Sequence, residues 1–102
     1  MNLIEEFKNL KQSVLPEGRV VLFGSRARGD FRKTSDYDLL ILMQKSTGSF
    51  SSDFDKFGWP FIQQGMNYGQ DVGVHIYSME EWESYQNKSL FYYYVSKEGV
   101  EL

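Results

Sequence analysis

A chain of 102 residues, 41% hydrophobic and 25% charged, has the composition of one ordinary globular domain, which we expect to span residues 1–102. Its formal net charge of −3 argues against a partner as extended as a long nucleic acid, which requires a basic stripe. The absence of cysteine excludes disulfides and thiolate metal sites and is compatible with a cytoplasmic location. The first residues lack a signal-peptide pattern, and no apolar run approaches the roughly 20 residues of a membrane span.

The first half of the chain predicts helix, strand, helix and strand. An amphipathic helix begins at a capping Asn2, stops before Pro16, and has an apolar face formed by Leu3, Ile4, Phe7, Leu10 and Val14. Residues 20–23 form a short β-branched and aromatic strand, and residues 26–32 can form a short helix. Residues 39–43 are all apolar, which is typical of a strand buried on both faces.

The second half continues the alternation. Residues 44–52 are polar and predict a loop, and residues 54–68 have helical spacing that Gly58, Pro60 and Gly65 interrupt, which predicts a broken helix. Residues 71–77 alternate between apolar and polar positions and predict a strand with one core face. A capping box of Ser78 and Glu81 starts a helical region, whose second piece covers residues 90–97 before a stop at Gly99.

A Gly24-Ser25 step between the first strand and the short helix suits a bound phosphate. Glycine lets a phosphate approach the backbone closely, the free amides of a helix N-terminus attract its charge, and Ser25 can add a hydroxyl donor. The P-loop pattern of common ATPases is absent from the sequence. By themselves, the same two residues are also typical of a tight turn.

Asp36 and Asp38 stand two residues apart at the entry to the apolar strand, so their side chains share one face. Two carboxylates this close repel each other unless a cation lies between them, and Mg²⁺ accepts such oxygen ligands. The alternative is that Asp36 caps a turn and Asp38 is solvated. Because five apolar residues follow, the pair lies at the mouth of a buried strand, where a rigid site is expected.

These motifs together resemble a known family signature. The segment Gly24-Ser25-x-Ala27-Arg28-Gly29, then five residues, then Ser35-Asp36-x-Asp38-Leu39, is similar to that of the minimal nucleotidyltransferases, a branch of the DNA polymerase β superfamily. The predicted order α-β-α-β-α-β-α is also the order of that family, so the resemblance covers nearly the whole chain. It implies a nucleotidyltransferase fold of the α/β (α+β) class, with a small mixed β-sheet flanked by helices.

The resemblance also implies an activity. Such enzymes transfer a nucleoside monophosphate, here expected to be AMP, from a nucleoside triphosphate to a hydroxyl acceptor with the help of two Mg²⁺ ions. It assigns nucleotide binding to Gly24, Ser25 and Arg28, and metal binding to Asp36 and Asp38.

The resemblance further implies a third carboxylate from a later strand. Asp71 fits, because it begins the alternating strand and lies on its polar face. It would hold the acceptor-side metal and take the hydroxyl proton. Asp53, Asp55 and Glu80 are the alternatives, although they stand in a loop or at a helix start.

Three further features have structural interpretations beside functional ones. Arg28 could attract the triphosphate or tie down its own loop. His75 lies about 13 Å along the strand from Asp71, and we expect a partly buried structural residue. Residues 90–95 are apolar or aromatic throughout, and a helix can bury only one stripe of such a run. We therefore expect exposed aromatics there that contact another protein.

Two functions of different classes remain open. The first is an active nucleotidyltransferase; many small stand-alone members of the family resemble antitoxins that modify a helical HEPN-type toxin partner. The second is an antitoxin or regulatory binding module of the same fold with little or no catalysis. The partner would be a protein acceptor of the HEPN type or a second copy in a homodimer. A tRNA-modifying or antibiotic-modifying enzyme would need an acceptor domain beyond this length.

Overall fold

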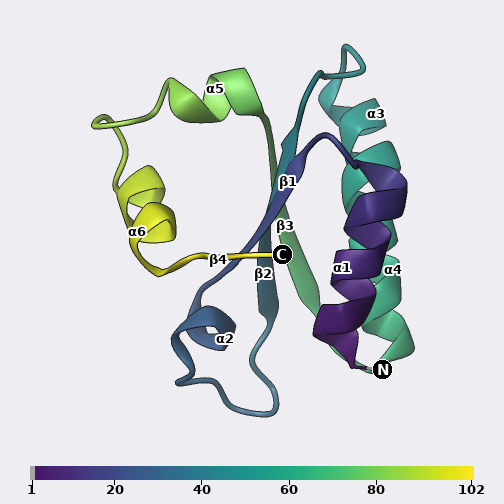
Figure 1. Cartoon of the computed structure of the whole chain (residues 1–102). Coiled ribbons are helices and arrows are strands. Elements are labelled where there is room, and N and C mark those ends of the chain that lie inside the picture. The colour runs from purple at the N-terminus through teal and green to yellow at the C-terminus, as the bar shows by residue number, and fades with distance from the viewer. Residues whose placement is uncertain (1) are drawn as a thin grey trace.

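The computed structural model describes residues 2–102 and has a four-stranded mixed β-sheet between two helical layers (Figure 1). In the spatial order β3-β2-β1-β4, the strands are β3 (Val72–Ser78), β2 (Tyr37–Met43), β1 (Arg19–Phe23) and β4 (Val100–Glu101). β2 runs antiparallel to β1 and parallel to β3, and β4 pairs antiparallel with the other edge of β1. The expected α/β class with a small mixed sheet is confirmed.

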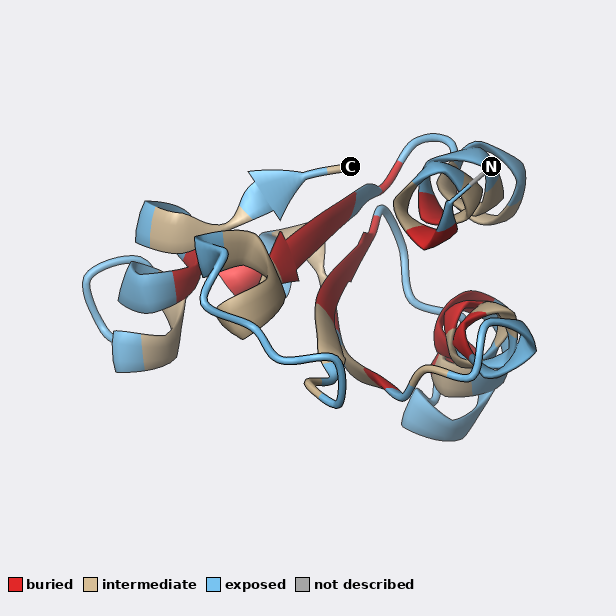
Figure 2. Cartoon of the chain, turned by 90° about the horizontal axis from the view of Figure 1, so that it is seen from below, coloured by how far each residue is buried: buried red, intermediate tan, exposed pale blue. Residues whose placement is uncertain are grey.

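One face of the sheet is covered by two long helical stretches, which Figure 2 shows end-on. Its elements are α1 (Leu3–Val14), α3 (Phe50–Asp53), the π-helical turn η1 (Phe54–Gly58) and α4 (Trp59–Asn67). α1 begins where the side chain of Asn2 accepts the N–H of Glu5 at 2.9 Å, as the sequence predicts. The larger core lies in this layer, and its fully buried members include Phe7, Val20, Leu39, Ile41 and Phe61.

The opposite face is covered by α5 (Met79–Glu83) and α6 (Leu90–Glu98). Ser78 caps α5 by accepting the N–H of Glu81 at 3.1 Å, as predicted. A second, smaller core lies under these helices and contains Val21, Leu40, Leu42, Trp82 and Val95. Alternate residues of β2 thus enter the two cores, which explains why residues 39–43 are all apolar.

The helical region after β2 differs from its prediction. Residues 50–53 are helical rather than part of a loop, because the side chain of Ser49 caps this turn by accepting the N–H of Ser52 at 3.2 Å. Gly58 does not break the helix, which continues through η1 into α4. A Cβ at Gly58 would lie 2.8 Å from Ile76 Cδ1, so glycine here allows the helix to pack directly on β3.

The other two residues expected to interrupt this helix are also accommodated. Pro60 stands in the first turn of α4, where proline is tolerated. A Cβ at Gly65 would collide with Val72 Cγ2, so this glycine is a second position of close helix–sheet contact. The prediction of a broken helix was therefore wrong: packing against β3, rather than a chain break, accounts for both glycines.

Two element ends also differ from the sequence prediction. The short helix α2 covers Ser25–Arg28 rather than residues 26–32, because Gly29 adopts a left-handed conformation with φ of +88° and ends it. β4 was not predicted, since two residues are too few to show a period. It matters because it pairs with β1 next to the start of α2. In the part of the chain that the structure describes, every helix is too short or too polar for a membrane crossing.

Candidate functional site

The Gly24-Ser25 step forms a sharp turn at one end of the sheet, between β1 and α2. Gly24 has φ of +76°, a left-handed conformation that favours glycine, and its carbonyl accepts the amide N–H groups of Ala27 and Arg28 at 3.1 Å. No side chain caps α2 at its start. Gly24 and Ser25 are only partly buried at this turn, and phosphate binding there stays a prediction.

Asp38 lies directly beside this turn. It is the second residue of β2 and pairs with Phe23 on β1 and with Gly73 on β3. A Cβ at Gly24 would collide with Asp38 Oδ2, and a Cβ at Gly73 would lie 3.5 Å from Asp38 Oδ1. The carboxylate thus fits between two glycines, one on each neighbouring strand, and only glycine at position 24 leaves room for it.

The surroundings of Asp38 disfavour its negative charge. Partial burial raises the pKa of the Asp38 carboxyl group, and the nearby charge of Asp36 raises it further, while His75 and Arg28 act in the opposite direction. Asp36 itself is exposed and precedes β2 by one residue. The structure therefore brings these two predicted carboxylates within electrostatic reach of each other, in an arrangement that a bound cation would relieve.

Asp71 stands at the same end of the sheet. Its carbonyl accepts the N–H of Tyr37 at 3.0 Å. Tyr37 of β2 pairs with Val72 of β3, and Asp36 and Asp71 are the residues that come immediately before them. Asp71 and Asp36 are therefore adjacent in register. Their carboxylates are not gathered into one cluster, however: within residues 2–102 no three His, Asp or Glu side chains form a group that could hold a metal ion.

The alternative carboxylates lie elsewhere. Asp53 is buried at 3% exposure, and its oxygens accept hydrogen bonds of 2.6–2.7 Å from Ser46 and Thr47 in the loop after β2. These contacts give Asp53 a structural role at the opposite end of the strand from Asp38. Asp55 is exposed in η1, and Glu80 is exposed in α5, beyond the far end of β3. Of the four candidates, Asp71 is the one near the Gly24-Ser25 turn.

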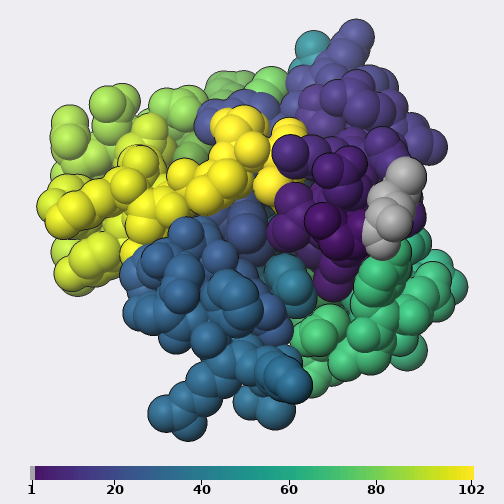
Figure 3. Space-filling model, turned by 60° about the horizontal axis from the view of Figure 1, so that its bottom comes forward, coloured from purple at the N-terminus to yellow at the C-terminus, as the bar shows by residue number. Residues whose placement is uncertain are grey.

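Arg28 fastens the turn to the C-terminal helix. Its guanidinium forms ion pairs with Asp30 at 3.3 Å and with Glu98 of α6 at 3.1 Å. In Figure 3 the segment around α2, drawn in blue, accordingly lies against the yellow C-terminal part of the chain. These contacts match the structural interpretation of Arg28, and the residue remains close enough to lower the pKa of Asp38.

Two contacts near the site were not predicted. His75 is exposed rather than partly buried, and its ring stands against Phe23 of β1 and Phe91 of α6 at centroid distances of 5.5 and 5.2 Å. The guanidinium of Arg26, a residue to which the sequence analysis gave no role, lies over the rings of Phe31 and Tyr37. Both aromatic residues lie inside the motif, Phe31 in its spacer and Tyr37 between Asp36 and Asp38, and they were the signal that could have indicated this stacking.

The chain is similar in sequence to known proteins. Residues 1–94 match the family model described as a nucleotidyltransferase domain. A 47-residue stretch is 45% identical to a Methanocaldococcus jannaschii protein named as a candidate protein adenylyltransferase; the match covers 44% of this chain and about half (48%) of that relative.

Two solved structures have a similar fold. One is the crystal structure of a toxin–antitoxin with AMP-PNP, with a TM-score of 0.61 and 19% identity over 99% of this chain and 72% of that one. The other is a candidate nucleotidyltransferase from Sulfolobus solfataricus, with a TM-score of 0.57 and 25% identity over 97% of this chain and 75% of that one.

Proposed function

Because this chain belongs to the nucleotidyltransferase domain family, we propose that it transfers AMP from ATP to a hydroxyl group of a protein acceptor, with Mg²⁺ as cofactor. The observation that carries the proposal is the position of Asp38, whose carboxylate lies between Gly24 of the phosphate turn and Gly73 of β3, within electrostatic reach of Asp36. The choice of AMP and of a protein acceptor is supported by the name of the Methanocaldococcus jannaschii relative.

The residues at this end of the sheet fit Mg²⁺. Asp36 and Asp38 offer hard carboxylate oxygens, and partial burial, followed by the charge of Asp36, raises the pKa of Asp38. Asp36 and Asp38 would hold the first ion, and Asp71 would join them at the second. When bound, two Mg²⁺ ions neutralise the phosphate charge and lower the pKa of the acceptor hydroxyl.

The protein's own groups bind and orient the substrates. The backbone at Gly24 and the hydroxyl of Ser25 would hold the triphosphate, with α2 directed at it. Asp71 is exposed at the start of β3, so an acceptor hydroxyl can approach it from solvent, and its carboxylate would take the hydroxyl proton. Catalysis would then consist mainly of positioning and charge neutralisation.

A transfer assay tests this proposal. The purified chain is incubated with Mg²⁺, each α-³²P-labelled nucleoside triphosphate in turn, and the protein encoded beside it in the genome. Transfer of label from ATP to protein supports the activity if EDTA, which removes Mg²⁺, prevents that transfer. Nucleotide binding without any transfer would instead support the regulatory binding module. A chain that neither binds nucleotide nor transfers label would exclude both functions.

Ser25→Ala should weaken nucleotide binding without abolishing it. The substitution removes one hydroxyl donor to a charged phosphate while the backbone of the turn stays in place. A hydrogen bond to a charged group contributes about 1.5–3 kcal/mol, so we expect roughly a ten- to hundredfold loss of affinity. Calorimetric titration with a non-hydrolysable ATP analogue measures it, and Ser84→Ala, in the exposed turn after α5, is the matched control. An unchanged affinity would make Ser25 a turn residue only.

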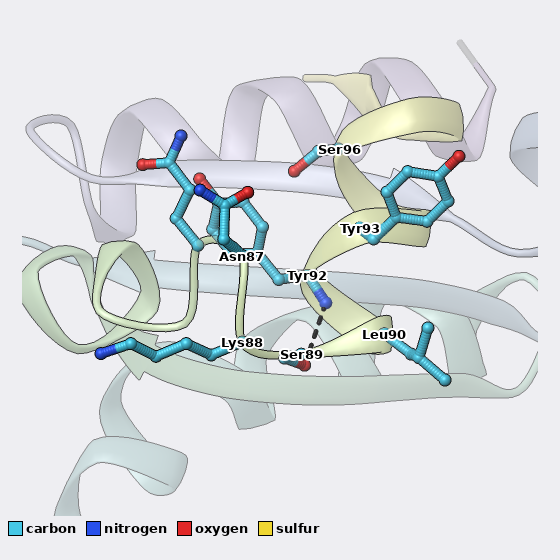
Figure 4. A pocket seen from close by; sticks show the side chains of 8 residues that line it. Asn87, Lys88, Ser89, Leu90, Tyr92, Tyr93 and Ser96 are labelled. Atoms are coloured by element: carbon cyan, nitrogen blue, oxygen red, sulfur yellow. Dashed lines mark hydrogen bonds between the residues drawn. The ribbon is translucent and has the colours of Figure 1, made fainter.

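The acceptor partner is proposed to bind the outer face of α6. Leu90, Tyr93 and Tyr94 project from this face with exposed fractions of 75%, 54% and 54%. Beside them lies a groove of about 480 Å³ that Asn87 and Ser96 help to line (Figure 4). Exposed apolar patches of this kind mark protein contacts.

Charge indicates what kind of partner fits there. Lys88 precedes α6 and Lys97 lies over the ring of Tyr93 at 5.8 Å, so the apolar face is flanked by positive charge on a protein whose net charge is −3. A second copy would bring these lysines against each other, whereas a helical partner of the HEPN type with acidic residues beside an apolar stripe would complement them. A protein partner in general is also suggested by the toxin–antitoxin structure with this fold.

Leu90→Asp combined with Tyr93→Ser should abolish co-purification with this partner while leaving ATP binding unchanged. The two side chains are exposed, so their loss removes contact area without opening a cavity in either core. Met66→Asp combined with Trp59→Ser, at exposed positions of α4 in the opposite layer, is the control. If the α6 variant and the α4 control co-purify equally well with the partner, the partner binds elsewhere. If the isolated chain forms a dimer that the α6 variant disrupts, the partner is a second copy.

A further inference from the structure

The Arg26 side chain joins segments that are far apart in the sequence. Its guanidinium lies over the Phe31 ring at 4.3 Å and over the Tyr37 ring at 4.4 Å. It donates hydrogen bonds to the carbonyl oxygens of Lys33 at 3.2 Å and Ser35 at 3.1 Å. The guanidinium of Arg26 thus contacts both the loop between α2 and β2 and the first residue of β2.

A further hydrogen bond reaches β3. Arg26 Nη2 donates to Gln70 Oε1 at 3.4 Å, across 44 residues of sequence. Arg26 and two of the residues that it contacts are each adjacent in sequence to a residue of the proposed site. Ser25 precedes Arg26, Asp36 follows Ser35, and Asp71 follows Gln70. Arg28 differs from Arg26, because its guanidinium pairs with Asp30 and Glu98 instead.

We infer that Arg26 is a positioning residue, which fixes the phosphate turn, Asp36 and Asp71 relative to one another. This inference rests on the proposed function. Its physical basis is that the three segments meet at the end of the sheet, just before β2 begins at Tyr37 and β3 at Val72. The backbone hydrogen bond from Tyr37 to Asp71 joins β2 to β3 there, and the contacts of Arg26 add the phosphate turn and the residue before Asp36. A planar guanidinium can stack on two rings and donate in several directions at once, and a lysine ammonium cannot replace it in this role.

Arg26→Lys is the decisive variant, because it keeps the positive charge and removes the stacking and the forked donors. We expect kcat for transfer to fall about tenfold or more, the magnitude by which misplaced catalytic groups reduce rates. The KM for ATP should change less than about threefold. The substitution displaces Asp36 and Asp71 without changing any charge, and this lowers the stabilisation of the transition state more than the binding of ATP in the ground state. Arg32→Lys, at an exposed position of the same loop, is the matched control and should behave as wild type.

Spectra of a second variant separate this inference from a direct contact with ATP and from the proposed activity itself. In ¹H–¹⁵N spectra of the nucleotide-free protein, Arg26→Ala should shift the amide signals of Asp36 and Asp71 and leave those of Leu40 and Leu42 in place. Adding tens of millimolar guanidinium to this variant should restore the wild-type signals, whereas the same concentration of urea should not.

Three outcomes would overturn the inference. The first is a wild-type kcat together with unshifted Asp36 and Asp71 signals. The second is a loss confined to the KM for ATP, which would make Arg26 a direct phosphate ligand. The third is general loss of the spectrum, which would make it a residue needed for folding alone. If the wild-type chain proved inactive, the spectra would still decide the positioning role.

Discussion

Replacing Asp38 by Asn is expected to abolish nucleotide transfer while leaving the fold intact. The amide keeps the size of the side chain and its place between Gly24 and Gly73, but it loses the negative charge that would hold a cation beside Asp36. We expect turnover to fall at least about a hundredfold, the scale found when one group of a preorganised charge site is removed. Label transfer at saturating ATP and Mg²⁺ measures the loss, and circular dichroism checks the fold.

The same variant should be at least as stable as the wild type near neutral pH. The pKa of Asp38 is raised in the folded protein, first by burial and then by Asp36, so the ionised form is disfavoured there relative to the unfolded chain. Stability from such a group is present below its unfolded pKa and is lost as the pH rises through the folded pKa. The asparagine variant avoids that loss. Its advantage in melting temperature should therefore vanish as the pH falls and Asp38 becomes protonated in both states.

Two comparisons make this result specific. Asp36→Asn should give the same loss of transfer, because both carboxylates are proposed to hold the metal. Asp55→Asn, at an exposed position on η1, removes an equal charge from another part of the surface and should leave turnover unchanged. In thermal melts, Mg²⁺-ATP should stabilise the wild type and Asp55→Asn but neither site variant. Full turnover in Asp38→Asn would refute the metal assignment.

Gly24→Ala is expected to have the second largest effect, on both binding and stability. Gly24 has φ of +76°, and a Cβ there would collide with Asp38 Oδ2. With a ψ of −160°, Gly24 lies in a backbone region that essentially only glycine reaches, and its strain costs another residue about 1–3 kcal/mol. The collision adds to this cost and forces either the turn or the carboxylate out of place, so phosphate binding and metal binding should fail together. Chemical denaturation and titration with an ATP analogue measure the two effects.

Gly29→Ala separates conformational strain from the collision. Gly29 also has a left-handed φ, of +88°, but a Cβ there would meet no atom within 4 Å. This control should lose about 1–2 kcal/mol of stability, a fall of several degrees in melting temperature, with near-normal affinity for the nucleotide. Equal behaviour of the two alanine variants would mean that the close approach between Gly24 and Asp38 has no functional importance.

Much of the fold could be predicted from local patterns. The continuous apolar run at residues 39–43 gave a strand buried on both faces, and alternation at residues 71–77 gave β3, because side chains of a strand point alternately to its two faces. The capping residues Asn2 and Ser78 marked helix starts within one residue. The motif also directed attention to Asp36 and Asp38, whose proximity depends only on their spacing along one strand.

What failed depends on contacts between distant segments. Gly58 has the local signature of a helix breaker, and its real neighbour, Ile76, is 18 positions away in the chain. The hydrogen bond between Arg26 and Gln70 is equally invisible in a pattern of neighbours. The short strand β4 forms because β1 offers it a free edge, so no property of its own two residues could predict it. Such contacts require the topology to be known first.

The pairing of β4 with β1 has a consequence for how the protein is made. The Gly24-Ser25 turn follows β1, yet β1 is completed by Val100 and Glu101, and Arg28 is held by Glu98. Arg19 and Glu101 also pair at 2.8 Å, across 82 residues of chain. Closing so long a loop costs conformational entropy before any contact repays it. During translation the phosphate-binding turn, although synthesised early, would therefore reach its final form only after the last residues of this sequence have left the ribosome.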